Sequence, residues 1–180
     1  MASSTVPREN VALQILVFSI DTQYWGVEVK HVDQVVQSVA PAPTPHTPPG
    51  IRGIDTQHGG PTVVIDSGVV FGDEQHSGNE HPAVIIDRGG EPSMSLSVET
   101  IHGVYTVPTD YIALEYDRGE IPADLTSILC TAVIENTDPE DTTLPTMMNR
   151  VWLLSPNAIA LGIFTSIYDY NQSDELQTIP

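Results

Sequence analysis

Apolar runs broken by short polar turns repeat along most of this 180-residue chain. Residues 24–29 (YWGVEV) alternate, with Trp25 and two valines on one face, and a longer apolar run at 11–20 precedes them. Such runs predict β-strands, and the polar turn at 21–23 predicts that the two strands form a hairpin. From Val29 the valine spacing changes to about three, which predicts a short helical turn before another extended piece.

The same signals continue to the C-terminal part of the chain. Further strands are predicted at 50–55, 61–66, 83–87, 93–99, 127–135 and 150–154. Residues 41–49 hold five prolines, which predicts a rigid extended connector laid across a barrel, because proline cannot donate to a β-ladder. Residues 72–82 are predicted as an exposed loop, and 157–164 as a modest helix. Short strands with frequent turns indicate an all-β barrel or sandwich.

Charge narrows the possible partners. The chain has 24 acidic and six basic residues, a net charge of −18, which repels nucleic acid and anionic membrane surfaces. The acidity fits a solvated acidic surface, with adaptation to a high-salt cytosol as the alternative. No apolar run approaches the roughly 20 residues that span a bilayer, so membrane insertion is not expected. The N-terminus lacks a signal peptide, and the single Cys130 forms no internal disulfide. We therefore expect a cytoplasmic protein with a buried, inert thiol at Cys130.

One motif raises the possibility of catalysis. VVIDSG at 63–68 resembles the local pattern of an aspartic peptidase around Asp66, which requires two carboxylates about 3 Å apart that share a proton. The second carboxylate would come from IIDRGG at 85–90 or from another copy of the chain. Arg88 would then bring a long cation beside the pair. The alternative, that Asp66 ends a strand and caps a turn, is favoured.

Other catalytic and metal-binding patterns are weak. His76, Glu80 and His81 lie close together in a glycine-containing loop, which offers nothing to orient the imidazole rings, so only adventitious metal binding is expected. The chain has no nucleophile elbow, P-loop or dinucleotide fingerprint. We predict no cofactor, no metal and no catalytic residue, a combination that favours a binding protein.

Four segments, taken in order, resemble the CheW-like adaptor domain of bacterial and archaeal chemotaxis systems. They are ILVFSIDTQYWGVEVKHVDQVV, PPGIRGIDTQHGGPTVVIDSGVVFG, AVIIDRGGEPSMSLSVETIHGVYTVP and RVWLLSPNAIALGIF. The resemblance spans about residues 13–164. It implies an all-β fold of two interleaved, packed five-stranded SH3-like barrels with short helices and a shared apolar seam. The expected organisation is a flexible N-terminus at 1–10, the CheW-like domain at 11–167 and a polar tail at 168–180.

The resemblance also implies a function. It implies a non-enzymatic adaptor that couples the cytoplasmic tip of a chemoreceptor to the regulatory domain of a CheA-type histidine kinase, in chemotaxis or related motility. The expected partner-binding residues lie near the rim of one barrel: Val32, Gln34, Ile54, Thr56 and His58. For the valine, core packing is the alternative.

This chain departs from the family pattern in several places. His58 stands where the family has a turn arginine, and Gln57 where it has an apolar residue. The acidic position after the helical turn falls on Gln34, with Asp33 one position earlier. Histidine replaces arginine only as a shorter, pH-dependent donor. A diverged member of the family is therefore expected.

Overall fold

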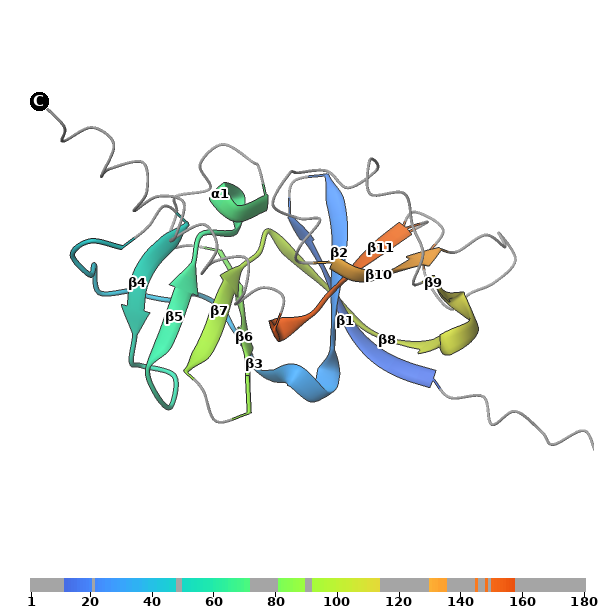
Figure 1. Cartoon of the computed structure of the whole chain (residues 1–180), viewed down its shortest axis with the longest axis horizontal. Coiled ribbons are helices and arrows are strands. Elements are labelled where there is room, and N and C mark those ends of the chain that lie inside the picture. The colour runs from blue at the N-terminus through green and yellow to red at the C-terminus, as the bar shows by residue number, and fades with distance from the viewer. Residues whose placement is uncertain are drawn as a thin grey trace, which may run out of the picture.

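The computed structural model describes residues 12–20, 22–47, 50–71, 81–89, 92–113, 130–135, 145, 148 and 150–157. Within these ranges the chain forms eleven β-strands in two sheets, with one short α-helix and two 3₁₀ turns. Figure 1 shows the two sheets side by side, and the all-β prediction is confirmed. No helix among the described residues has the length and apolar character needed to cross a membrane.

The first sheet joins strands from both ends of the described chain. Its order is β8-β1-β2-β11-β10-β9. The strands are β1 (Ala12–Ile20), β2 (Gln23–Glu28), β8 (Thr100–Pro108), β9 (Ile112–Ala113), β10 (Cys130–Glu135) and β11 (Arg150–Leu154). This sheet has six strands among the described residues, not the five predicted, because the two-residue β9 extends it.

The first sheet must curl strongly. β8 and β9 stand at its two ends, yet only the 3₁₀ turn η2 (Thr109–Tyr111) separates them in sequence. A flat sheet of this size would hold its outer strands roughly 24 Å apart. The chain from Pro108 to Ile112 spans at most about 14 Å. The two outer strands are therefore brought toward each other, as in a barrel.

The second sheet is built from the middle of the chain. Its order is β3-β6-β7-β5-β4. The strands are β3 (Val32–Val36), β4 (Ile51–Asp55), β5 (Thr62–Ile65), β6 (Ala83–Ile86) and β7 (Ser93–Ser97). The proline-rich connector lies against β4, where Ala42 and Ile54 exchange two backbone hydrogen bonds of 2.9 and 3.2 Å. At this point the connector lies across an outer strand of the sheet, as the prediction of an extended connector requires.

The hairpin predicted for residues 11–29 is confirmed, because β1 and β2 pair antiparallel. The pairs β4–β5 and β6–β7 are also antiparallel. The helical turn predicted from Val29 is the 3₁₀ turn η1 (Val29–His31), and the chain then extends into β3. The sequence did not predict the helix α1 (Ser67–Phe71). It forms because Val70 and Phe71, which suit a strand by propensity, pack into the core instead.

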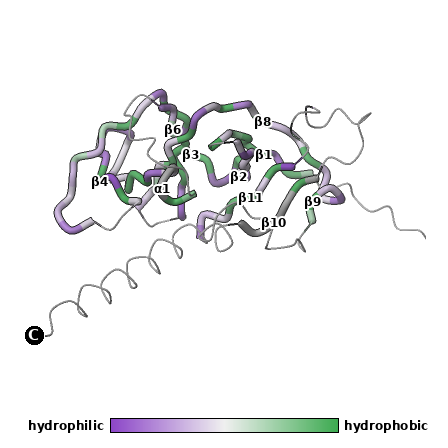
Figure 2. The backbone as a smooth tube through the Cα atoms, turned by 90° about the horizontal axis from the view of Figure 1, so that it is seen from above, coloured by the Kyte–Doolittle hydropathy of each residue, from purple (hydrophilic) through white to green (hydrophobic). Residues whose placement is uncertain are grey.

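The largest core cluster is a seam that both sheets share. On β1, Leu16 and Phe18 face this seam, whereas Ile15 and Val17 face a smaller cluster within the first sheet. The second sheet contributes to the seam from β5, β6 and β7. Strands buried on both faces explain the continuous apolar runs of the sequence. Figure 2 shows hydrophobic stretches near the middle of the molecule and a pale to purple loop at the β4 end.

Several predictions fall outside the described residues. They concern the flexible N-terminus, the loop at 72–80, most of the helix at 157–164 and the tail at 168–180. Cys130 lies in β10 as predicted, but its side chain is not among those described.

Candidate functional site

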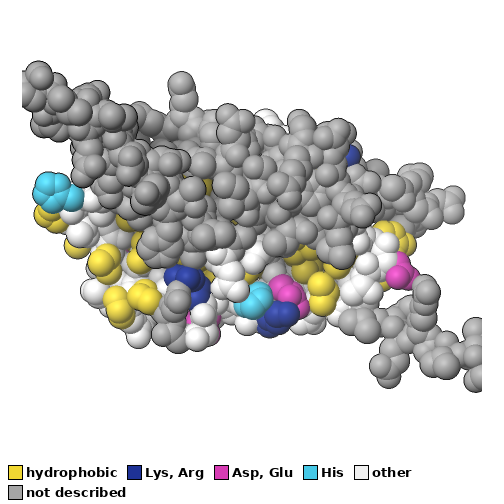
Figure 3. All heavy atoms as spheres, in the orientation of Figure 1, with side chains coloured by type: hydrophobic (Ala, Val, Ile, Leu, Met, Phe, Trp, Pro, Cys, Tyr) yellow, Lys and Arg dark blue, Asp and Glu magenta, His cyan; other side chains and the backbone are white. Residues whose placement is uncertain are grey.

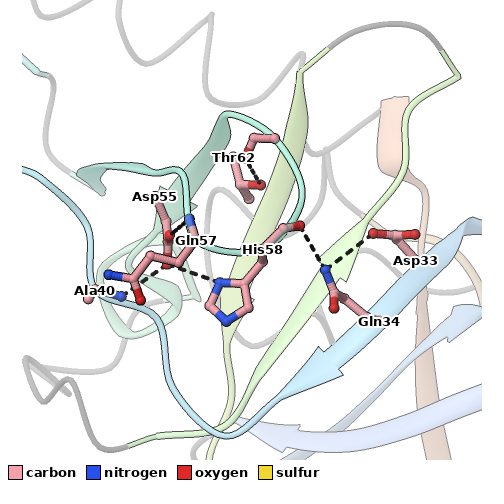
Figure 4. A network of polar contacts seen from close by, with 8 residues as sticks. Asp33, Gln34, Ala40, Asp55, Gln57, His58 and Thr62 are labelled. Carbon is pink, nitrogen blue, oxygen red and sulfur yellow. Dashed lines mark hydrogen bonds and ion pairs between the residues drawn. The ribbon is translucent and has the colours of Figure 1, made fainter.

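The candidate site is the turn at 56–60, which joins β4 to β5, together with its neighbours on β3 and on the connector. Asp55, the last residue of β4, lies at the base of this turn and is only 1% exposed. Figure 4 shows its carboxylate between the connector on one side and the turn on the other. The turn is therefore anchored by a buried acidic side chain.

The Asp55 carboxylate accepts contacts from three directions. Its Oδ1 accepts a hydrogen bond of 2.7 Å from the Gln57 backbone N–H. Its Oδ2 accepts one of 3.1 Å from the Ala40 backbone N–H and lies 3.2 Å from Nδ1 of His58. The two backbone hydrogen bonds let this carboxylate stay buried, because a buried charge needs hydrogen-bond donors to replace water.

These contacts shift the titration of Asp55. Burial by itself raises the pKa of this carboxyl, but the backbone donors Gln57 and Ala40, together with His58, outweigh it. The net result is a pKa below the ordinary value of 3.8. The carboxylate therefore stays ionised, and its contacts stay intact, through the neutral range.

Gln34 holds the turn from the other side. Its Nε2 on β3 donates a hydrogen bond of 2.9 Å to the backbone carbonyl of His58. β3 and β4 are the outer strands of the second sheet, so this bond joins one edge of the sheet to the turn after the other edge. Beside the bond lies an open depression of about 600 Å³, lined by Asp33, Gln34, Gln57, His58, Gly59, Gly60, Thr62 and Ser93.

The five predicted partner-binding residues fall into two groups. The structure joins Gln34 on β3 to His58. Thr56 is exposed in the same turn as His58, and Ile54, on β4 before this turn, is 40% exposed. The His58 side chain is only 21% exposed and contacts Asp55, so its ring helps to hold the turn in place. Val32 is half-buried and packs against the seam, in line with the core alternative.

Sequence reasoning missed Asp55. It sits before Thr-Gln-His-Gly-Gly, and an aspartate at the start of a glycine-containing turn often bonds the backbone N–H two residues on. Asp87 forms the same kind of turn, accepting a 2.9 Å hydrogen bond from the Gly89 N–H. The turn bond of Asp55 could thus be read from the sequence, whereas its contact with Ala40 could not.

The lowered pKa of Asp55 predicts an acid-dependent loss of stability. We expect Asp55→Asn to lower the free energy of unfolding at pH 7 by about 1–3 kcal/mol, because buried donors lose an acceptor. The folded-state pKa is depressed, so the contribution of Asp55 is present above about pH 4 and is lost as the pH falls through the folded value. The difference in the free energy of unfolding between wild type and Asp55→Asn, measured by urea unfolding, should therefore become smaller as the pH falls from 5 to 2.5.

Asp110→Asn is the matched control for this experiment, since Asp110 is exposed on η2. We expect it to change stability by less than about 0.5 kcal/mol at any of these pH values. If the stability difference between wild type and Asp55→Asn stayed constant down to pH 2.5, the stabilising role of the ionised Asp55 carboxylate would be contradicted.

The carboxylates proposed for a peptidase pair lie apart. β6 runs antiparallel to β7, and β7 runs parallel to β5, so β5 and β6 point in opposite directions. Asp66 follows the end of β5 and Asp87 the end of β6, so they lie at opposite ends of the sheet, more than about 10 Å apart. One chain does not form the pair from these residues.

Asp66 has a structural position instead. Its backbone N–H donates to the Gly50 carbonyl at 2.8 Å, and its carbonyl accepts the Val70 N–H at 3.0 Å, at the start of α1. The cavity that it lines with His81 and Glu99 measures about 10 Å³, room for one water at most. This cavity is too small to hold a peptide.

The metal-ligand candidates are only partly described. His76 and Glu80 lie outside the described residues, and His81 lines the small cavity beside Asp66. Within the described part of the chain, no group of three or more His, Cys, Asp or Glu side chains could hold a metal ion.

Comparison with known proteins identifies the family. The model of the CheW-like domain matches residues 14–131. Among solved structures, the chain is similar to the crystal structure of the scaffolding protein TtCheW from Thermoanaerobacter tengcongensis. The two share 20% sequence identity and a TM-score of 0.65, over 81% of this chain and 90% of that one. This likeness shows a shared fold, and no curated protein matches the chain. Because the family model covers more than half of the sequence, this chain belongs to the CheW-like domain family.

Proposed function

We propose that this protein is a non-enzymatic scaffold in chemotaxis or related motility signalling. In this role it links the cytoplasmic tip of a chemoreceptor to the regulatory domain of a CheA-type histidine kinase, in the cytoplasm and without a cofactor. The observation that carries the proposal is the match of residues 14–131 to the CheW-like domain on a two-sheet fold. The similar TtCheW is described as a scaffolding protein, which supports the class of function.

We assign the kinase contact to the rim of the second sheet, defined as Gln34, Ile54 and the turn at 56–60. Ile54 and Thr56 are exposed there, and the rest of the turn, Gln57 to Gly60, lines an open depression together with Gln34. An apolar side chain within a polar surround is the usual composition of a protein interface. On the face shown in Figure 3, hydrophobic side chains gather at the end of the molecule that carries β4.

The test is direct binding to a kinase domain. The purified chain is titrated by calorimetry with the regulatory domain of a histidine kinase encoded beside its gene, and binding is expected. Thr56→Arg should weaken this binding at least tenfold, because a long, charged side chain replaces a small exposed hydroxyl in the interface.

Thr106→Arg is the matched control. Thr106 is also exposed, but it lies on β8 at the edge of the first sheet, and the substitution changes the net charge equally. It should leave the affinity within twofold. Equal weakening by both variants would contradict the assigned surface. Failure of the wild type to bind both the kinase domain and a receptor-tip fragment would contradict the proposed function.

A further inference from the structure

The turn at 56–60 is ordered by polar contacts at its base. It contains Gly59, at φ +92°, and Gly60. Apart from each glycine and its chain neighbours, no atom of the described residues lies within 4 Å of the place where a Cβ on either would stand. Glycines in open space leave a backbone free to adopt many conformations. Packing therefore does not hold the tip of this turn, and the contacts at Gln57 and His58 become decisive.

Those contacts converge on one carboxylate. Asp55 binds the Gln57 N–H and His58 Nδ1 within the turn, and it binds the Ala40 N–H on the connector. Figure 4 shows Gln34 as the second tether, attached to the His58 carbonyl from β3. Asp55 thus ties the turn to the connector crossing β4.

We propose that Asp55 is a positioning residue for partner binding, which holds the turn at 56–60 in its binding conformation before the partner arrives. This inference rests on the proposed function. The side chain is too deeply buried to contact a partner, and so it acts through Gln57 and His58. Fixing a flexible segment in its bound form raises affinity, because the partner does not have to order it. The largely buried His58 ring contributes to the same arrangement, because its Nδ1 lies 3.2 Å from the Asp55 carboxylate.

The test combines two readouts on Asp55→Asn, His58→Ala and the double variant. Amide hydrogen exchange reports the order of residues 56–60, and calorimetry with the kinase domain reports affinity. Asparagine has one acceptor oxygen where aspartate has two. It therefore cannot accept from Gln57 with one oxygen while the other meets Ala40 and His58. We expect exchange in the turn to accelerate at least tenfold and affinity to fall about tenfold in Asp55→Asn. The double variant should be no worse than Asp55→Asn, since both residues act in one unit.

Val107→Ala is the control for a merely structural effect. Val107 is fully buried in the cluster of the first sheet, so its truncation lowers global stability without touching the turn. At a temperature where all variants are folded, it should leave exchange at 56–60 and affinity within twofold of wild type.

The outcomes separate the two proposals. Normal exchange in Asp55→Asn overturns the positioning role. Faster exchange with unchanged affinity also overturns it, while the proposed function stands. If the wild type binds no kinase domain, the assigned kinase contact fails, and so does any role of Asp55 in it. If the wild type also binds no receptor-tip fragment, the proposed function fails as well. The exchange data then decide only whether Asp55 orders the turn.

Discussion

Gly53→Ala is expected to destabilise the fold by about 3 kcal/mol or more. Gly53 has φ +142°, and a Cβ there would stand 2.1 Å from the carbonyl oxygen of Ala42. No flexible side chain can move aside, because the obstacle is the backbone of the connector. The two Ala42–Ile54 hydrogen bonds would have to break, and the connector would lift off β4. Urea unfolding monitored by circular dichroism measures the loss.

Alanine substitutions at two other glycines distinguish the cost of the clash with the connector from the cost of a positive φ. Gly59 has φ +92° but open space around it, so Gly59→Ala should cost only about 1 kcal/mol. Gly60 has open space and no positive φ, so Gly60→Ala should change stability by less than about 0.5 kcal/mol. If Gly53→Ala cost no more than Gly59→Ala, the close approach of the connector would be disproved.

Truncating the seam at Trp25 is the second large effect. Trp25→Ala should lower the free energy of unfolding by about 3–5 kcal/mol, because it empties the space between the two sheets. Trp25 is 1% exposed, and its ring centroid lies 4.8 Å from that of Phe71 and 6.5 Å from that of Trp152. Since Phe71 belongs to α1 beside the second sheet and Trp152 to β11, both sheets should unfold in one transition. Coincident fluorescence and circular dichroism curves would show this.

Trp25→Phe is the matched control for this truncation. It keeps most of the ring contacts and removes an indole N–H that has no acceptor among the described residues. We expect it to cost less than half as much as Trp25→Ala. Two separate transitions in the wild type would show that the seam does not couple the sheets.

The local pattern of the sequence predicted most strands. In YWGVEV, for example, the polar turn before it and the alternation within it predicted the hairpin of β1 and β2, which the structure confirms. The α1 helix was missed because Val69, Val70 and Phe71 are strand formers by propensity, and only packing of the last two into the seam explains the helix. The six-stranded size of the first sheet was missed because β9 is too short to give a pattern.

The candidate site was predicted in part. The family resemblance pointed to His58 and Gln34 at one rim, and the structure joins them by a hydrogen bond. It did not point to Asp55, one of whose partners, Ala40, lies fifteen residues away on another segment. Such a contact depends on how the connector crosses β4, which no local spacing encodes.

By itself, the sequence determined an all-β protein, because hydrophobic alternation, turn residues and prolines act locally on the backbone. The family was indicated separately, by the resemblance of four segments in order to the CheW-like domain. Only the tertiary structure decided which carboxylates lie close together and which one anchors the turn at 56–60. It placed Asp66 and Asp87 at opposite ends of a sheet through strand direction. It buried Asp55 under the connector, where backbone donors keep it ionised. Strand direction and burial arise from long-range packing, so these roles appear only when the whole chain has folded.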